Sequence, residues 1–304
     1  MLYFSTVMTM KNKLRGSLAL MIATIIWGSA FIAQSVGMDH IGPMTFQAIR
    51  CGLAVVFLVI VVFFFDKDKK SYFWNWANAK LWKAGAICGS ALFVAAGLQQ
   101  IGLQYTTAGK AGFITAMYIV LVPILGLFFR KKPPITAWFS VAIAVAGLYL
   151  LSCAGVTGVN FGDLCLIGSA CGFAVQITLI DRMSGGLDGL RLNCIQSLFC
   201  SIWSALVMFA TESPSLPNIA ACAMPLAYAG ILSMGVAYSL QIVGQKHLDP
   251  TPASLIMSLE SVFAALCGWL LLNEQMSAAE FCGCALVFSA VILSQLPEKK
   301  KTHG

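Results

Sequence analysis

The sequence predicts an all-α integral membrane protein whose ten transmembrane helices form two inverted five-helix repeats. Three observations lead to this fold class: an apolar composition, ten apolar runs of spanning length, and a match between the two halves of the chain. Of 304 residues, 59% are hydrophobic and 10% are charged, against about 25% charged in an ordinary soluble domain. Runs of about 18 or more apolar residues can cross a bilayer, and they lie at 16–36, 42–65, 84–104, 107–129, 135–153, 161–180, 190–210, 222–244, 252–272 and 278–296.

The Lys and Arg residues predict how these spans are oriented. Seventeen of the 19 lie before the first span, in every second loop, or after the last span. The positive-inside rule makes that side cytoplasmic, so we expect both termini in the cytoplasm. The basic residues before the first span favour an uncleaved anchor over a signal peptide, and translation starts at either Met1 or Met10.

The two halves of the chain match at two constant offsets. An offset of 146 pairs Gly16 with Gly162 and Trp27 with Phe173, and an offset of 142 pairs Gln99 with Gln241. These matches predict one repeat at 11–153 and a second at 161–297. Because each repeat has five spans, the second enters the membrane from the opposite face, which is the inverted architecture of many transporters. Gly168 and Gly172 form a GxxxG motif in the sixth span, which predicts close helix packing there.

Several classes of protein lack support in the sequence. There is no P-loop, HExxH or GxSxG motif, and no clustered basic face that would bind nucleic acid. Most of the 11 Cys residues fall within apolar runs and no CxxC occurs, so we interpret them as packing thiols. We therefore expect no enzymatic activity, no catalytic residue, no cofactor, no metal site and no nucleic-acid partner.

Two charged residues lie deep within the predicted spans. Arg50 is roughly 10 to 12 Å below the outer surface and Glu260 about 12 Å above the inner one, at 1.5 Å per helical residue. Such charges are costly in a membrane and mark a functional site or need a partner. Two interpretations stay open: an ion pair that pins two helices together, or groups that handle a substrate or protons.

Two further charges lie near the predicted outer face. Lys110 opens the fourth span, where it either extends to the interface or attracts anions at the entrance of a cavity. Asp163 lies two residues into the sixth span, where capping of the helix N-terminus explains it. We consider both as candidate entrance residues.

Uncharged polar and aromatic residues complete the candidate substrate-binding or gating site. The amides and the phenol are Gln99, Gln176, Gln196 and Tyr118, and the expected apolar walls are Trp27, Phe31 and Tyr238. In the repeat alignment Gln196 stands opposite Arg50, and Tyr118 stands opposite Glu260. A cavity that holds both signs of charge suits a zwitterionic or amphipathic ligand, although amides also bridge helices without any ligand.

Five short motifs, in order along residues 11–297, resemble the EamA-type transporters of the drug/metabolite transporter superfamily. They are Trp27-Gly28-Ser29-Ala30-Phe31, Pro43-x-x-Phe46-x-x-x-Arg50, Thr107-Ala108-Gly109-Lys110-Ala111, Gly162-Asp163-Leu164, and Leu259-Glu260-Ser261-Val262-Phe263 followed by Asn273-Glu274. The chain departs from the family at Ser261, where Pro is common, and at Arg130-Lys131-Lys132, where an acidic residue is expected. The first span has no acidic residue, so the proton mechanism of small multidrug exporters does not transfer.

The resemblance implies a permease with a central cavity. We expect a secondary transporter in a bacterial plasma membrane that exports small organic metabolites by rocking one helix set against the other. The expected partners are the lipid bilayer, a small-molecule substrate, and protons or a counter-substrate, in a monomer or homodimer. An uptake permease of the same fold, and a membrane scaffold or sensor that transports nothing, are the alternatives.

Overall fold

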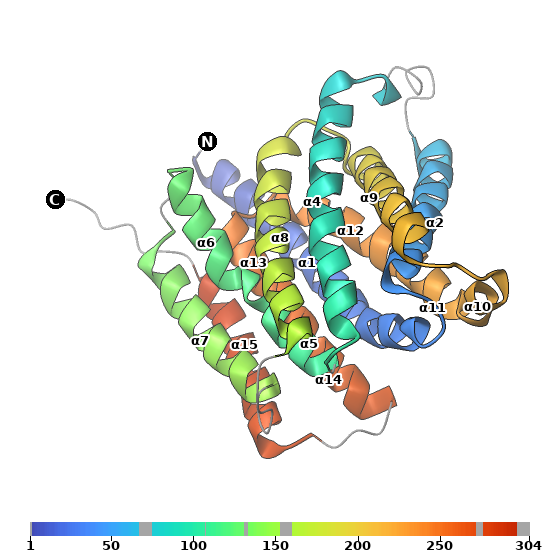
Figure 1. The fold of residues 1–304 in the computed structure, drawn as a ribbon. Coiled ribbons are helices and arrows are strands. Elements are labelled where there is room, and N and C mark those ends of the chain that lie inside the picture. Colours follow the sequence, from blue (N-terminus) through green and yellow to red (C-terminus); the bar gives the residue numbers. More distant parts are fainter. Residues whose placement is uncertain are drawn as a thin grey trace.

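A computed structural model describes residues 2–66, 75–106, 108–130, 133–152, 160–271 and 276–296, with side chains from residue 10 to 270 and beyond 275. The described chain is helical, with no strand in these ranges, and its helices pack into one bundle (Figure 1). Basic residues at 67–70, 131–132 and 299–301, which contributed to the predicted orientation, lie outside these ranges. The elements are α1 (Leu2–Met38), α2 (Pro43–Phe65), α4 (Ala79–Leu103), α5 (Ala108–Ala116), α6 (Tyr118–Phe128), α7 (Ile135–Ser152), α8 (Phe161–Met183), α9 (Gly189–Thr211), α10 (Leu216–Ala221), α11 (Ala223–Ala227), η2 (Tyr228–Ala237), α12 (Tyr238–Gln245), α13 (Pro250–Met257), α14 (Leu259–Leu271) and α15 (Ala278–Gln295).

Each apolar run of the sequence corresponds to helical structure. Within the described residues, nine helical segments are long and apolar enough to cross a membrane, and the apolar helix Ile135–Leu151 is shorter. The predicted boundaries agree within a few residues except at the start of the first and third spans, where α1 and α4 begin earlier. The count of ten crossings, the inverted repeat and the location of the termini stay predictions.

Three spans that we predicted as continuous helices are interrupted in the structure. A turn residue, Met117, separates α5 from α6, and another, Ser258, separates α13 from α14. The eighth span contains a ten-residue π-helix, η2. Ser258 donates its hydroxyl to the carbonyl oxygen of Leu255 at 2.8 Å, which competes with the helical ladder, whereas nothing in the residue type of Met117 signals a break.

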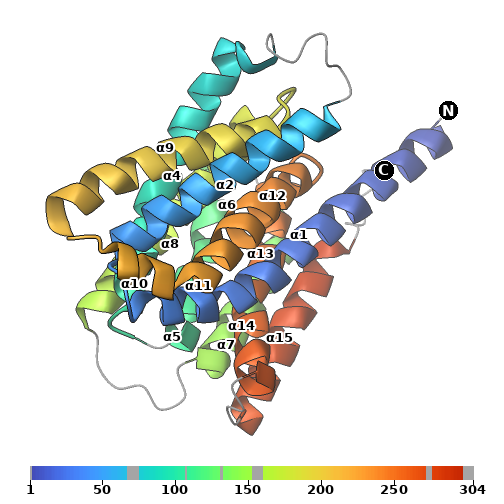
Figure 2. The same cartoon turned by 90° about the vertical axis from the view of Figure 1, so that its right-hand side faces the viewer.

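The helices from the two halves of the chain are interleaved. In sequence order α4 belongs to the first half, yet it packs between α8 and α9 (Figure 1). Likewise α2 packs against α9, as Figure 2 shows. It also packs against η2, and α7 packs against α15. The bundle is therefore held together by contacts between the halves.

Glycines permit the closest approaches between helices. A Cβ atom on Gly172 would lie 2.8 Å from the Cα atom of Ala95, so the predicted close packing at the GxxxG motif is confirmed for this glycine. A Cβ on Gly102 would lie 2.9 Å from the carbonyl oxygen of Gly162, and a Cβ on Gly16 would lie 3.0 Å from that of Gly244. These distances leave no room for a side chain without movement of the backbone.

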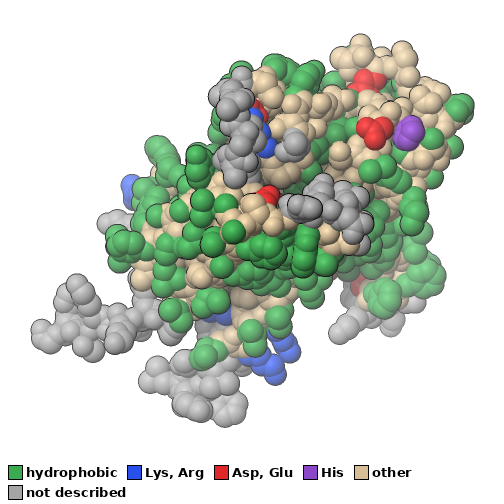
Figure 3. Space-filling model, turned by 90° about the horizontal axis from the view of Figure 1, so that it is seen from below, with side chains coloured by type: hydrophobic (Ala, Val, Ile, Leu, Met, Phe, Trp, Pro, Cys, Tyr) green, Lys and Arg blue, Asp and Glu red, His purple; other side chains and the backbone are tan. Residues whose placement is uncertain are grey.

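The surface of the bundle is apolar and part of its interior is polar. Phe65, Phe128 and Phe209 are each more than 70% exposed, and hydrophobic side chains cover much of the described surface seen in Figure 3. In contrast, Gln47, Gln100 and several other amides are completely buried. This distribution is expected of a bundle whose solvent is lipid, because lipid tails exclude polar groups.

Candidate functional site

A central cavity lies where helices from both halves of the chain meet. Its empty space amounts to about 490 Å³, a volume that includes the part open to solvent. The predicted residues Arg50, Glu260, Trp27, Phe31, Gln99, Tyr118 and Tyr238 line it, together with Gln34, Phe173, Ile177, Ser233, Gln241 and Met257. Gln176 and Gln196 do not line it, and neither do the two candidate entrance residues.

Arg50 is held at the cavity wall by two glutamines. It is 2% exposed, and its guanidinium donates to Oε1 of Gln34 at 2.5 Å and to Oε1 of Gln47 at 2.8 Å. Its Nε is buried and makes no hydrogen bond to the described residues. Amide oxygens orient the guanidinium but do not neutralise its charge, so Arg50 presents a buried positive charge to the cavity.

Our sequence reasoning missed Gln34. The signal was present, because Trp27, Phe31 and Gln34 have the i, i+4, i+7 spacing that places residues on one face of a helix. In the structure all three line the cavity from α1. Gln34 therefore extends the predicted aromatic wall with the amide that holds Arg50.

Glu260 lies across the same cavity and is bound by a phenol. The carboxylate is 7% exposed and accepts a hydrogen bond from the hydroxyl of Tyr118 at 3.2 Å. Both residues sit at the beginning of a half-helix, Glu260 in the first turn of α14 and Tyr118 at the start of α6. The positive end of the α14 dipole stabilises a carboxylate at this position.

Arg50 and Glu260 do not form a direct ion pair. Within the described part of the chain, the guanidinium of Arg50 donates to Gln34 and Gln47, and the carboxylate of Glu260 is bound by Tyr118. The interpretation of these two charges as a pair that pins two helices is therefore wrong. Each charge has neutral partners and faces the shared cavity.

Aromatic rings form the apolar walls of the cavity. The rings of Trp27 and Tyr238 meet edge to face with centroids 4.9 Å apart, and those of Tyr118 and Phe173 with centroids 6.4 Å apart. Within the described structure, Nε1 of Trp27 and Oε1 of Gln241 are buried without a hydrogen-bond partner. Buried polar atoms of this kind gain a partner when a ligand supplies one.

The remaining predicted amides divide between the cavity and the helix contacts. Gln99 lines the cavity and donates to the hydroxyl of Thr115 at 3.4 Å. Gln176 lies one step behind the wall, where its Oε1 accepts from Gln241 at 3.2 Å.

We predicted that Gln196 lines the cavity, but in the structure it lies outside the cavity wall. Its amide donates to Oδ1 of Asn193 at 2.9 Å. Asn193 in turn donates to the carbonyl oxygens of Met234 and Gly235 at 2.9 and 3.0 Å. Both carbonyls belong to the π-helix η2. Gln196 therefore orients Asn193, the side chain that binds η2. Unlike Arg50, it does not line the cavity.

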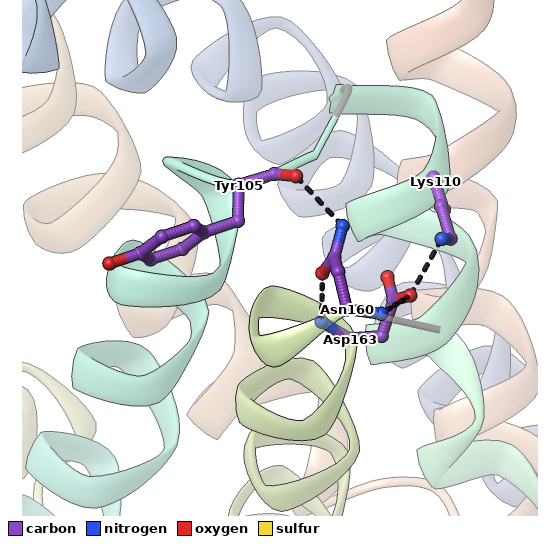
Figure 4. A network of polar contacts seen from close by, with 4 residues as sticks. All are labelled: Tyr105, Lys110, Asn160 and Asp163. Atoms are coloured by element: carbon purple, nitrogen blue, oxygen red, sulfur yellow. Dashed lines mark hydrogen bonds and ion pairs between the residues drawn. The ribbon is translucent and has the colours of Figure 1, made fainter. Parts of the chain in front are cut away.

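The two candidate entrance residues form an ion pair at one end of the bundle (Figure 4). Nζ of Lys110 lies 2.7 Å from Oδ2 of Asp163. Lys110 is 9% exposed, so the interpretation that it extends to the interface is wrong. The pair joins α5 to α8 and buries both charges.

Asp163 also caps helix α8, as predicted. Its Oδ2 accepts from the backbone N–H of Asn160 at 3.0 Å, and Oδ1 of Asn160 accepts from the backbone N–H of Asp163 at 3.0 Å. Asn160 further donates to the carbonyl oxygen of Tyr105 at 3.0 Å (Figure 4). This capping box and the ion pair together tie the α4 to α5 connection to the start of α8.

Eight of the 13 residues that line the cavity are related in pairs by the two offsets of the sequence. Four pairs of positions, at an offset of 146 or 142, all line it: Trp27 and Phe173, Phe31 and Ile177, Gln99 and Gln241, Tyr118 and Glu260. The other five have no such partner in the wall; they are Gln34, Arg50, Ser233, Tyr238 and Met257. Gln196, the equivalent of Arg50, lies outside the wall.

Comparison with known proteins gives consistent results. The EamA-like transporter family matches residues 14–153 and again residues 160–296. An uncharacterized transporter of Archaeoglobus fulgidus is 31% identical over 291 residues, covering 94% of this chain and 87% of the relative. The uncharacterized inner membrane transporter YedA of Escherichia coli is 26% identical over 290 residues, covering 91% and 90% of the two chains.

A solved crystal structure shares the fold. It superimposes with a TM-score of 0.76 at 16% identity, covering 92% of this chain and 96% of the other. The two family matches together span most of the sequence, and the archaeal relative exceeds 30% identity over nearly its whole length. The chain is therefore a member of the EamA-like transporter family.

Proposed function

We propose that this protein is a secondary transporter that exports a small zwitterionic or amphipathic metabolite, such as an amino acid, across a bacterial plasma membrane. The observation that carries this proposal is the central cavity, where Arg50 and Glu260 present opposite charges between aromatic walls. Alternating access between two inverted five-helix repeats, at 11–153 and 161–297, moves the substrate. The bundle then has ten spans with both termini in the cytoplasm.

The chemistry of the cavity favours a ligand that carries both charges. A carboxylate forms charge-assisted hydrogen bonds with Arg50, and an ammonium group pairs with Glu260. Burial of a charge without an opposite charge costs on the order of several kcal/mol per ion. A bound zwitterion offsets this cost at both positions, because it places an opposite charge beside Arg50 and beside Glu260. The rings of Trp27, Phe173 and Tyr238 then contact the apolar part of the ligand.

The pairing of equivalent residues supports the inverted repeat. Four pairs of equivalent positions line the cavity, as expected where two repeats meet at a twofold axis. The contact of Gly102 with Gly162 recurs as the contact of Gly244 with Gly16, and the same two offsets relate these pairs. The family also matches the chain twice, once for each proposed repeat.

Charged residues at one end of the bundle support the orientation. Lys13, Asp181 and Lys246 surround one hollow, although they come from α1, α8 and the α12 to α13 connection. Arg191 at the start of α9 pairs with Asp66 after α2. The side that we assign to the cytoplasm thus gathers basic residues from distant parts of the chain.

We assign the ion pair of Lys110 with Asp163 to the outer end, as part of a gate. The offsets relate these residues to Pro252 and Ser17 at the other end, where the residue types permit no such ion pair. In this proposal the substrate enters from the cytoplasm. Opening of the outer end separates α5 from α8 and releases the substrate outside.

Flux measurements in liposomes test the proposal. Purified protein is reconstituted with a panel of labelled amino acids and related metabolites, beside Glu260→Gln and Arg50→Gln. Glu280→Gln is the matched control, because Glu280 caps α15 and does not line the cavity. Flux of at least one compound is expected for the wild type and the control and is lost in both cavity variants; equal flux in all four proteins refutes the assigned site.

The direction of transport needs a separate measurement. Membrane vesicles of inverted orientation are expected to accumulate the substrate, since their outer surface is cytoplasmic, and vesicles of native orientation are not. An imposed pH gradient identifies coupling to protons, and preloading with unlabelled substrate identifies exchange. Accumulation confined to vesicles of native orientation identifies an uptake permease and refutes export.

A further inference from the structure

Two buried thiols from opposite halves of the chain lie against each other. Sγ of Cys51, on α2, is 3.4 Å from Sγ of Cys200, on α9. Both residues are completely buried and both are free thiols. A disulfide has an S–S distance of about 2.05 Å, so the two sulfur atoms need to approach by roughly 1.4 Å for the bond to form.

This thiol pair is connected to the cavity. Cys51 directly follows Arg50 in the chain, and the side chain of Gln47 contacts both Arg50 and Cys200. Its Oε1 accepts from Arg50 at 2.8 Å while its Nε2 lies 3.5 Å from Sγ of Cys200. The pair is thus separated from a cavity-lining charge by a single side chain.

We propose that Cys51 and Cys200 form a dithiol site that a hydroperoxide oxidises to a disulfide. One thiol attacks the peroxide, forming an S–O bond as the O–O bond breaks, and water leaves with the thiol proton. The sulfur of the second thiol then attacks the resulting sulfenic acid, so that an S–S bond forms, the S–O bond breaks and a second water leaves. Two thiols and one hydrogen peroxide thus give one disulfide and two waters.

The bond fixes α2 to α9. These helices belong to different halves of the chain and pack along each other, and they are the second helices of the two proposed repeats. A covalent link at their contact holds the halves in the arrangement of this structure. This inference rests on the proposed function: if the protein works by alternating access, oxidation of the two thiols arrests it and a reductant restores it.

The burial of the pair determines which reagents reach it. Hydrogen peroxide is close to water in size and enters a bundle during small openings, whereas a bulky maleimide does not. Labelling of the protein unfolded in SDS serves as the standard, because unfolding exposes every thiol. We expect Cys51 and Cys200 to be labelled in the unfolded protein and to stay unlabelled in the folded one.

Mass spectrometry of the reconstituted full-length protein tests the site directly. After hydrogen peroxide and alkylation of the remaining thiols, a digest without reductant is expected to contain one peptide pair linked through Cys51 and Cys200. Dithiothreitol removes it. Cys88→Ser is the matched control, because Cys88 is equally buried, on α4; the link forms in this variant and is absent from Cys200→Ser and Cys200→Ala.

Each outcome decides part of the proposal. Recovery of Cys51 and Cys200 as free thiols, or as separately oxidised residues, after treatment with hydrogen peroxide overturns the dithiol site. With the link formed, flux is expected to fall at least tenfold and to recover with dithiothreitol; undiminished flux overturns the arrest. Absence of flux from the untreated protein counts against the proposed transport, while the linked peptide still supports the dithiol site.

Discussion

Substitutions that remove one cavity charge at a time, combined with ligands that lack the matching charge, test how the cavity recognises a zwitterion. Glu260→Gln is combined with leucine, which carries an ammonium group, and with N-acetylleucine, which does not. Arg50→Gln is combined with leucine and with leucine amide, which lacks the carboxylate. Leucine is the first probe, to be replaced by whichever amino acid the flux screen identifies.

The size of the expected effect follows from burial. Arg50 is 2% exposed and Glu260 is 7% exposed, so each pairs with its ligand group largely away from water. Two unit charges about 4 Å apart interact by about 4 kcal/mol at an effective dielectric constant near 20. Desolvation of the ligand group offsets part of this, leaving a coupling of about 1 to 3 kcal/mol, or roughly 5- to 150-fold in affinity.

The assay is competition against the equilibrium binding of labelled leucine to proteoliposomes, which gives an apparent affinity for each compound and does not require the variant to transport. Glu260→Gln is expected to weaken the apparent affinity for leucine by this factor and to change the affinity for N-acetylleucine by less than about threefold. Arg50→Gln is expected to weaken the affinity for leucine by the same factor and to leave the affinity for leucine amide nearly unchanged. If each substitution weakened a compound and its analogue equally, the charges would support the fold and would not recognise the ligand.

Two further predictions concern the helix contacts. Gly102→Ala and Gly16→Ala are each expected to destabilise the protein by about 1 to 3 kcal/mol, because the new Cβ meets backbone; Gly109→Ala, where nothing lies within 4 Å, is expected to be neutral or stabilising, and thermal unfolding in detergent separates the two cases. Asp163→Asn keeps an acceptor for the capping box but loses the charge opposite Lys110, so we expect lower thermal stability and faster exchange of backbone amides near the start of α8. The double variant with Lys110→Met is expected to regain part of that stability, and a double variant as unstable as the sum of the single ones refutes a direct pairing.

The sequence predicted the helices well because apolar runs and their polar boundaries follow from the membrane itself. It also located the cavity from few residues, since a charge such as Arg50 or Glu260 persists in a span when a structure requires it. The partners of these charges were harder to predict. Gln34 carries no charge, and its selection needs the helical face that it shares with Trp27.

Gln196 shows why a repeat alignment does not transfer a role. Its position is equivalent to that of Arg50, but a π-helix packs against α9 and leaves carbonyl groups that need donors. Asn193 supplies those donors and Gln196 fixes its orientation. No pattern in the sequence marks η2 as a π-helix, so the demand that it places on α9 was invisible before the structure.

The breaks at Met117 and Ser258 connect the fold to the proposed mechanism. They are separated by 141 residues in the sequence, close to the 142 that relates Tyr118 to Glu260, so each half of the chain has its break just before a cavity residue. Breaks at equivalent depths bring two half-helix N-termini toward one cavity, as in transporters with discontinuous helices. A half-helix turns about such a break more readily than a continuous helix bends. Tyr118 and Glu260 lie at the start of their half-helices and bind each other. A ligand that takes the carboxylate from the phenol would change this contact between the two halves of the chain, and in the proposed mechanism this change links substrate binding to movement.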